Sequence, residues 1–258
     1  MNDKPKTVTA AVLVIGDEIL SGRTKDRNIG YIAEYLSRIG VEMREARVVP
    51  DVEEEIVAAL NALRTRYDYI FTTGGIGPTH DDITADAVAK AFGVGISEDP
   101  RAMAIMLERY KADELTPARR RMTRIPDGAD LVENPISKAP GFRIGNVIVM
   151  AGVPSVMQAM FDAAVKDVRT GQIMLVETIE AGGLPEGRYG SVLGEIATAR
   201  PEVIIGSYPS FADGKFRNQI VVRGKDAGAV ADARHAVEAM IATLSGDARP
   251  LSPFSPSG

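Results

Sequence analysis

The sequence predicts an α/β protein with a doubly wound, mostly parallel sheet, followed by a second, smaller α+β domain. Two observations predict the sheet. Apolar, β-branched runs alternate with stretches of helical periodicity up to Gly93, and the first run is continuously apolar, as in a strand covered on both faces. The pattern changes after Thr170-Gly171, where two strands follow each other without a helix. We therefore expect domains at 1–170 and 171–246, and a Pro/Ser-rich tail at 247–258 that is disordered.

Composition excludes several classes of protein. The 258 residues are 45% hydrophobic and 25% charged, with a net charge of −5, which is ordinary for a protein with a substantial core and does not suggest a nucleic-acid binder. There is no cysteine, and only two histidines, so disulfides and thiolate metal sites are excluded and a His-rich zinc site is not expected. No apolar run is long enough for a membrane span, and the N-terminus lacks a signal-peptide layout. We expect a cytoplasmic protein.

The first strand is expected from Thr7 to Ile15 and ends in an acidic, glycine-bounded loop, Gly16 to Gly22. In open α/β sheets, ligands bind at this carboxyl edge of the strands. The loop continues to Asn28, where a helix of 3.6-residue periodicity begins and runs to Gly40. Asn28 is either an N-cap and nothing more or part of a site.

Val41 to Val49 is the second expected strand, and Asp51 with Glu54 forms a D-x-x-E capping-box pattern for the next helix. Tyr67 to Thr73 is the third strand. Right-handed crossovers would bring the ends of the first and third strands to one edge of the sheet, provided that these strands are close neighbours. The carboxylates that follow each strand would then face one pocket.

The third strand leads into the segment with the strongest functional signal. Gly74, Gly75 and Gly77 separate this strand from a helix that ends near Gly93, and such a turn presents backbone N–H groups to a phosphate. The spacing fits neither a P-loop nor a dinucleotide fingerprint. Asp81 and Asp82 would repel a phosphate unless a cation lies between them, and Mg²⁺ is commonly held by carboxylates together with phosphates. Alternatively, one of these carboxylates caps the helix and the other is solvated.

The remaining elements follow from the same signals. Helices are expected after Pro100, Thr116-Pro117 and Pro154, and a hairpin around Gly145-Asn146. The second helix carries four arginines, at 119, 120, 121 and 124, which we interpret as a solvated face, with one arginine clamping a phosphate as an alternative. In the second domain we expect strands at 173–179, 203–208 and 216–223 and helices at 188–199 and 227–244.

The segment TTGGIGPTHDDITADAVAKAFG, residues 72–93, resembles the core motif of the molybdopterin-binding (MoCF biosynthesis) domain family. Within that family it is most similar to the N-terminal domain of CinA proteins and to the equivalent domain of animal FAD synthases. The GGIGPTHDD form, with His80, resembles the FAD-synthase branch more than the molybdopterin-adenylating enzymes. GDEIL-x-G-x-x-x-D-x-N from Gly16, NPISKAPGF from Asn134 and the GVP sequence at 152–154 resemble its other signatures. Lys138 stands where a small residue is common, as either a phosphate contact or an exposed lysine, and Ala151 stands where proline is common. GSYPSF, in the second domain, resembles the accessory region of CinA-like proteins.

The resemblance implies a metal-dependent pyrophosphatase that acts on ADP-ribose or, in the FAD-synthase branch, on FAD. Hydrolysis of a P–O–P bridge needs a cation, an activated water and positioned N–H donors. The candidate catalytic residues are Asp17, His80, Asp81 and Asp82, with a solvent-facing histidine as the alternative for His80. The candidate metal ligands, for Mg²⁺, Mn²⁺ or Co²⁺, are Asp17, Glu18, Asp81 and Asp82. The candidate phosphate- and ligand-binding residues are Ser21, Asp26, Asn28, Thr73, Gly74, Gly75, Gly77 and Thr79.

Two other functions use the same residues. The domain would either hold molybdopterin or a nucleotide without turning it over, or, as a weaker alternative, transfer an adenylyl group to molybdopterin. In each case the expected partner is a small-molecule nucleotide or pterin phosphate, with no nucleic acid and no membrane. The resemblance also implies a homo-oligomer, because dimers and trimers both occur in the family.

Overall fold

The computed structural model describes residues 7–212 and 214–246. The chain divides into two compact units, Met1–Gln172 and Ile173–Gly258, so the division falls two residues after the predicted boundary. The predicted tail, 247–258, lies outside the described residues.

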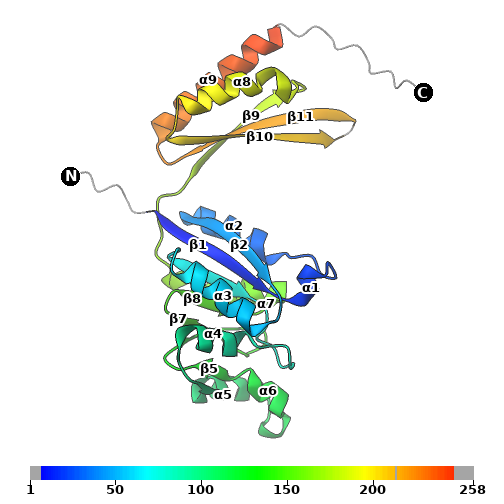
Figure 1. The fold of residues 1–258 in the computed structure, drawn as a ribbon, viewed down its shortest axis with the longest axis vertical. Helices are drawn as coiled ribbons and strands as arrows, with labels where there is room; N and C mark the ends of the chain where they lie inside the picture. The colour runs from blue at the N-terminus through cyan, green and yellow to red at the C-terminus, as the bar shows by residue number, and fades with distance from the viewer. Residues whose placement is uncertain (1–6, 213, 247–258) are drawn as a thin grey trace, which may run out of the picture. The chain divides into compact units, whose positions relative to one another are not determined.

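The first unit is built on a six-stranded, mostly parallel sheet (Figure 1). Its strand order is β2-β1-β3-β8-β7-β6. The first four strands in this order run parallel; β7 pairs antiparallel with β8, and β6 pairs antiparallel with β7. The bounds are β1 Val8–Ile15, β2 Val41–Val49, β3 Tyr69–Thr73, β6 Asp130–Val132, β7 Gly141–Ile144 and β8 Val147–Met150. The predicted fold class is confirmed, and the hairpin around Gly145-Asn146 joins β7 to β8.

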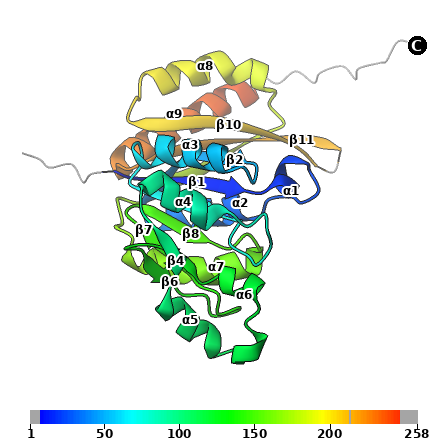
Figure 2. The ribbon, with the colours of Figure 1, turned by 60° about the horizontal axis from the view of Figure 1, so that its bottom comes forward.

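Helices cover both faces of this sheet (Figures 1 and 2). Along β1, Leu13 packs with α3 (Glu53–Arg64) and α4 (Thr84–Phe92), whereas Val12 and Val14 pack with α2 (Asn28–Arg38) and α7 (Pro154–Ala164). This two-sided burial explains why β1 is apolar at every position except Thr9. The shorter elements are α1 Asp17–Leu20, β4 Ile96–Glu98, α5 Pro100–Leu107, η1 Ala112–Glu114, α6 Pro117–Arg121, β5 Arg124–Pro126 and η2 Val165–Asp167.

The topology brings the strand ends together as expected. β1 pairs directly with β3, with Val14 opposite Thr73, and with β2 on its other side. The carboxyl ends of β1, β2, β3 and β8 therefore lie side by side at one edge of the sheet.

The second unit has a sheet of its own, with strand order β10-β11-β9 and antiparallel pairing throughout. Its elements are β9 Leu175–Gly182, α8 Glu186–Thr198, β10 Val203–Ala212, β11 Lys215–Gly224 and α9 Ala227–Gly246. Ile220 and Val222 of the central strand pack with Tyr189 of α8 and Val237 of α9. In neither unit is any of the described helices long and apolar enough to cross a membrane.

The capping of two helices differs from the pattern in the sequence. The N-cap position of α3 is Val52, with no side-chain cap, and the Asp51 carboxylate accepts the N–H of Asp17 in α1 instead, so the D-x-x-E pattern does not form a capping box. The predicted start of α2 at Asn28 is confirmed, but Asn28 does not cap the helix: the carboxylate of Asp26 accepts the N–H of Ile29 at 2.9 Å.

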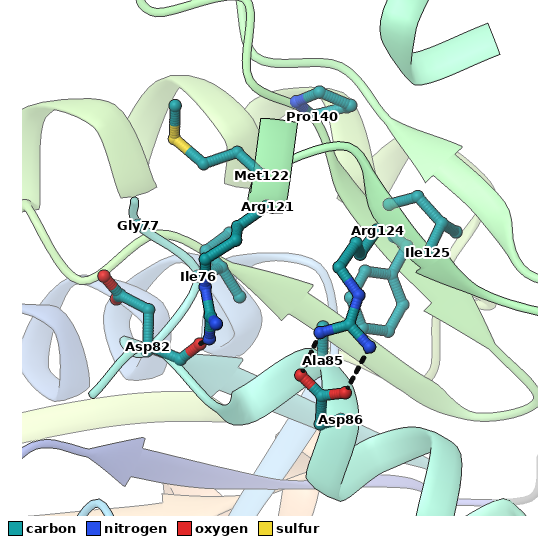
Figure 3. Close-up of a pocket in the computed structure, with 12 residues that line it drawn as sticks. Ile76, Gly77, Asp82, Ala85, Asp86, Arg121, Met122, Arg124, Ile125 and Pro140 are labelled. Atoms are coloured by element: carbon teal, nitrogen blue, oxygen red, sulfur yellow. Dashed lines mark hydrogen bonds and ion pairs between the residues drawn. The ribbon is translucent and has the colours of Figure 1, made fainter. Parts of the chain in front are cut away.

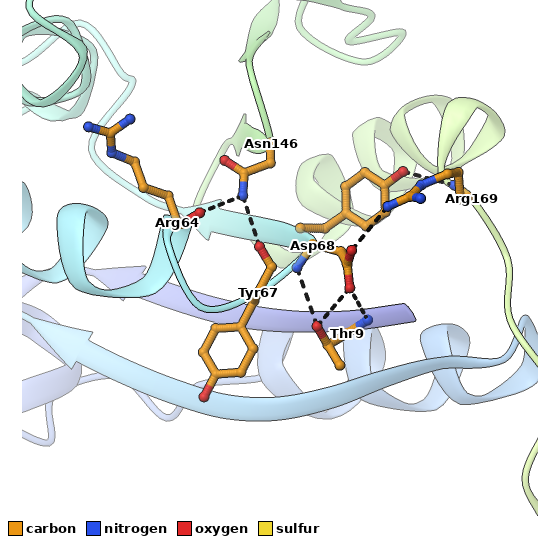
Figure 4. Close-up of polar contacts among 7 residues, drawn as sticks. Thr9, Arg64, Tyr67, Asp68, Asn146 and Arg169 are labelled. Carbon is orange, nitrogen blue, oxygen red and sulfur yellow. Dashed lines mark hydrogen bonds and ion pairs between the residues drawn. The ribbon is translucent and has the colours of Figure 1, made fainter. Parts of the chain in front are cut away.

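A polar network ties the start of the sheet to the end of the first unit (Figure 4). The carboxylate of Asp68 accepts the backbone N–H and the hydroxyl of Thr9, both at 2.9 Å, and pairs with Arg169 at 3.0 Å. The backbone N–H of Arg169 donates to the hydroxyl of Tyr69. Asp68 thus satisfies the first strand's N-terminal N–H and anchors the segment that leaves the domain.

We expect Asp68→Ala to lower the free energy of unfolding by about 2 kcal/mol, because the Thr9 N–H and the Arg169 guanidinium both lose their acceptor. Urea denaturation measures the change. Asp113→Ala, at an exposed position in η1, is the matched control and should stay within about 0.5 kcal/mol of the wild type. Equal stability of the two variants would show that the network contributes nothing.

Candidate functional site

A cavity of about 370 Å³ opens at the carboxyl edge of the parallel strands. This is the edge at which α/β sheets bind ligands, and the volume suits a small molecule. Its walls come from the ends of four strands and from the loop before β7. They comprise Ile15, Gly16, Glu18, Asp51, Gly74, Gly75, Ile76, Gly77, Asp81, Asp82, Met122, Asn134, Ser137, Ala139, Ala151, Gly152, Val153 and Val156.

The glycine loop can be built only from glycine at its first two positions. Gly74 and Gly75 have φ of +104° and +66°, a region that side chains disfavour. A Cβ on Gly74 would lie 2.1 Å from the carbonyl oxygen of Ile15, and one on Gly75 would lie 2.1 Å from the hydroxyl of Thr84. That hydroxyl donates to the Gly74 carbonyl at 3.0 Å. A side chain at either position would therefore dismantle the loop itself.

Asp82 is held by the loop rather than by the helix that follows it. Its carboxylate accepts the backbone N–H of Thr79 at 2.8 Å and the Thr79 hydroxyl at 2.5 Å. The N-cap position of α4 is Ile83, with no side-chain cap, so neither Asp81 nor Asp82 caps the helix. Thr79 does not line the cavity; its contribution is to orient Asp82, which does.

Asp81 is exposed at the mouth of the same cavity. The nearby hydroxyl of Thr79, and then the backbone N–H of Asp81 itself, lower the pKa of this carboxyl below its usual value. Asp81 is therefore ionised at neutral pH and adds a negative charge to the site.

Asp51 is a site residue that the sequence analysis missed. Its carboxylate accepts the backbone N–H of Asp17 at 2.9 Å, which joins the end of β2 to the end of β1. Burial raises the pKa of Asp51, and the negative charges of Asp17, Glu18 and Asp81 raise it further, against the lowering effect of the Asp17 N–H. Asp51 follows its strand closely, as Asp17 does, and this position could have indicated from the sequence that it belongs to the site.

The cavity combines acidic side chains with the backbone of the glycine loop. The carboxylates of Glu18, Asp51, Asp81 and Asp82 line it, and none of the lysines and arginines in the described residues does. In the described part of the chain, however, no three acidic or histidine side chains come close enough to form a metal-binding group. Carboxylate oxygens are the ligands that a hard divalent cation prefers, and these lie in one cavity, but they do not by themselves complete a coordination shell. Further oxygens would have to come from a ligand.

Several predicted residues do not line the cavity. Asp17 contributes its backbone N–H and its charge, Asp26 caps α2, and Ser21 follows α1 at an exposed position. Thr73 is buried in β3, where its hydroxyl has no partner. His80 points into solvent, with its side chain 99% exposed and its Nδ1 3.9 Å from an Asp81 oxygen.

Asn28 does not line the cavity, but its side chain holds a residue that does. Its side chain is buried, and its Nδ2 donates to the carbonyl oxygen of Gly152 at 2.8 Å, while its Oδ1 has no partner. Gly152 lines the cavity and passes close to Gly74, since a Cβ on Gly152 would lie 3.1 Å from the Gly74 Cα. Asn28 therefore fixes one wall of the site across 124 residues of sequence.

The opposite wall is organised by Asn134, which the sequence analysis noted only as part of the NPISKAPGF signature. Its Nδ2 donates to the carbonyl of Ala139 at 2.8 Å, and its Oδ1 accepts the N–H of Ser137 at 3.0 Å. All three residues line the cavity. Lys138, between them, has φ of +64° and pairs with Glu108 at 3.1 Å, so it does not contact the cavity.

Residues 11–170 match the family described as "Probable molybdopterin binding domain". The chain belongs to this molybdopterin-binding domain family. Residues 176–245 match a second family, "FAD synthase, middle domain". The predicted resemblance to both is confirmed, and the cavity described above lies wholly in the molybdopterin-binding domain.

Individual relatives agree with this assignment. A protein of Pyrobaculum arsenaticum is 34% identical over 78% of this chain and 79% of its own length. A CinA-like protein of Citrifermentans bemidjiense is 41% identical over 63% of this chain but only 41% of its own length. The crystal structure of a CinA protein of unknown function from Thermoplasma acidophilum matches with a TM-score of 0.60 and 36% identity, covering 64% of this chain and all of the other.

We expect Asp51→Asn to raise the free energy of unfolding by about 0.5 kcal/mol at neutral pH in the presence of EDTA, because it removes one of several crowded negative charges. The amide oxygen still accepts the Asp17 N–H. Because the pKa of Asp51 is higher in the folded state than in the unfolded chain, its ionisation weakens the fold as pH rises through the interval between the two values. The advantage of the variant should disappear below that interval.

Urea denaturation at neutral and acidic pH tests this expectation, with Asp113→Asn as the control at an exposed position. A destabilised Asp51→Asn variant at neutral pH would show that the Asp51 charge supports the fold rather than straining it.

Proposed function

We propose that the chain is a divalent-metal-dependent pyrophosphatase that cleaves the phosphoanhydride bridge of ADP-ribose or FAD. One observation supports this most: acidic side chains from the ends of β1, β2 and β3 line the same cavity as the backbone of Gly74–Gly77. Carboxylates alone would repel a diphosphate, and backbone donors alone would bind it without hydrolysis. Their combination suits a ligand that enters together with a cation.

The proposed roles follow from the placement of each group. The backbone of Gly75 to Gly77 lines the cavity and would donate its N–H groups to the phosphoryl oxygens. Glu18, Asp81 and Asp82 would hold Mg²⁺, Mn²⁺ or Co²⁺, with the charge of Asp17 nearby. When bound, the cation would neutralise the phosphates and make a coordinated water acidic. Thr79 keeps the Asp82 carboxylate directed by its two hydrogen bonds.

The alternative is a module that binds a pterin phosphate or nucleotide without turnover. The observation in its favour is that the described residues contain no ready-made group of three metal-binding side chains. His80, the histidine nearest to the acidic pair in sequence, points away into solvent and gives the site no positioned proton donor.

Release of AMP from ADP-ribose or FAD, with Mg²⁺ or Mn²⁺ present, tests the proposal. We expect the wild type to release AMP and Asp82→Asn to be slower by about 100-fold or more. The asparagine oxygen can still accept from Thr79, so the loop and the melting temperature should change little. The measurement is AMP formed per enzyme over time, together with a thermal melt.

The control is again Asp113→Asn, which removes the same charge outside the cavity and should keep full activity. A wild type that binds ADP-ribose or FAD but releases no AMP with either metal would identify the binding module instead. Full activity in Asp82→Asn would remove that carboxylate from the mechanism.

A further inference from the structure

One arginine beside the glycine loop differs from its neighbours. Arg120 pairs with Glu98, and both nitrogens at the end of the Arg124 side chain pair with Asp86, at 2.8 and 2.7 Å. Arg119 donates to the Glu114 carbonyl and stacks on a tyrosine ring. The sequence predicted that these arginines form a solvated helix face. This prediction fits Arg120, which is exposed, but not Arg121, which is half-buried.

Arg121 lies half-buried next to the loop that carries the proposed phosphate site (Figure 3). It lines a small hollow together with Gly75, Gly77 and Asp82, all of which also line the main cavity. Its Nη2 makes one long contact, 3.3 Å, with the backbone carbonyl of Asp82. Its Nε is buried and has no hydrogen-bond partner.

This arrangement leaves a charged donor without a matching acceptor. A guanidinium is always protonated, and a buried N–H of a charged group is costly unless it is paired. Arg121 and Arg124 are the two cations among the residues that line the hollow, and Asp86 already neutralises Arg124. Arg121 is therefore the positive charge that remains available beside an acidic site.

The size of the hollow limits what it can accept. Its volume of about 20 Å³ has room for one oxygen atom, whereas a whole phosphate group would not fit. A phosphate would thus remain on the Gly75–Gly77 backbone, and the guanidinium would supply one further N–H to one of its oxygens.

We propose that Arg121 is a specificity-determining residue that donates to a phosphoryl oxygen of the ligand on the glycine loop, so that the site selects a diphosphate ester over an uncharged nucleoside or pterin. This proposal rests on the proposed function and adds a residue to it. The competing explanation is purely structural: Arg121 would only hold the Asp82 carbonyl in place.

Calorimetric titration with the methylene-bridged analogue of ADP, which cannot be hydrolysed at the bridge, separates these explanations. With excess Mg²⁺, we expect Arg121→Met to bind the analogue at least about tenfold more weakly than wild type, and Arg121→Lys to lie between them. The matched control, Arg120→Met, removes the same charge from the adjacent position and should stay within about twofold. The salt dependence of binding should also weaken in Arg121→Met but not in the control, because only a lost charge contact changes it.

Wild-type affinity in Arg121→Met, or equal losses in Arg121→Met and Arg120→Met, would overturn this assignment while leaving the proposed function intact. Failure of the wild type to bind the analogue in Mg²⁺ would overturn both together.

A second measurement does not depend on the stability of the variants. The Nε–Hε signal of Arg121 in the NMR spectrum of the wild type can be assigned by its absence in Arg121→Lys. We expect this signal to shift when the analogue is added, because Nε gains an acceptor. An unchanged signal at saturation would contradict the proposed contact.

Discussion

The end of β3 passes so close to its neighbours that no side chain fits between them. A Cβ on Gly74 would lie 2.1 Å from the carbonyl oxygen of Ile15, and one on Gly152 would lie 3.1 Å from the Gly74 Cα. The N–H of Gly74 donates to the carbonyl of Met150, so the backbones of β1, β3 and β8 converge at this point. The glycine loop leaves the sheet here, and the hydroxyl of Thr84 then fixes it to the start of α4.

This convergence determines the electrostatics of the site. Because the strand ends lie side by side, the side chains that follow them gather around one cavity: Glu18 after β1, Asp51 after β2, and Asp81 and Asp82 after β3. Burial first, and then the charges of its acidic neighbours, raise the pKa of Asp51, so ionisation of this carboxyl opposes folding. A divalent cation would relieve the repulsion among these carboxylates. A phosphate-bearing ligand would itself require that cation, because the carboxylates repel it, and its oxygens would complete the coordination shell of the cation. Arg121 would add a positive charge from the protein itself, because Arg124, the other arginine of the hollow, is paired with Asp86.

Much of this architecture could be predicted from sequence because its signals are local. A strand, a helix and the turn after β3 could each be predicted from a stretch of a few residues: an apolar run, a helical periodicity and three glycines. The wrong or missed assignments depend on contacts distant in sequence. Asp51 looks like a helix cap beside Glu54, but the pairing of β1 with β2 directs it to the N–H of Asp17. Asn28 likewise binds a carbonyl 124 residues away, and Arg121 resembles its solvated neighbours until α6 is placed against the glycine loop.

The central claim is that cation and diphosphate complete each other's binding site. Calorimetry on the wild-type chain with the methylene-bridged ADP analogue, first in EDTA and then in saturating Mg²⁺ or Mn²⁺, tests it without turnover. The account predicts that the metal strengthens binding of the analogue by at least about tenfold, and that the analogue strengthens binding of the metal by the same factor, since such coupling is reciprocal. Equal affinity for the analogue in EDTA and in excess metal would contradict the account, because the acidic cavity would then accept a diphosphate without any cation.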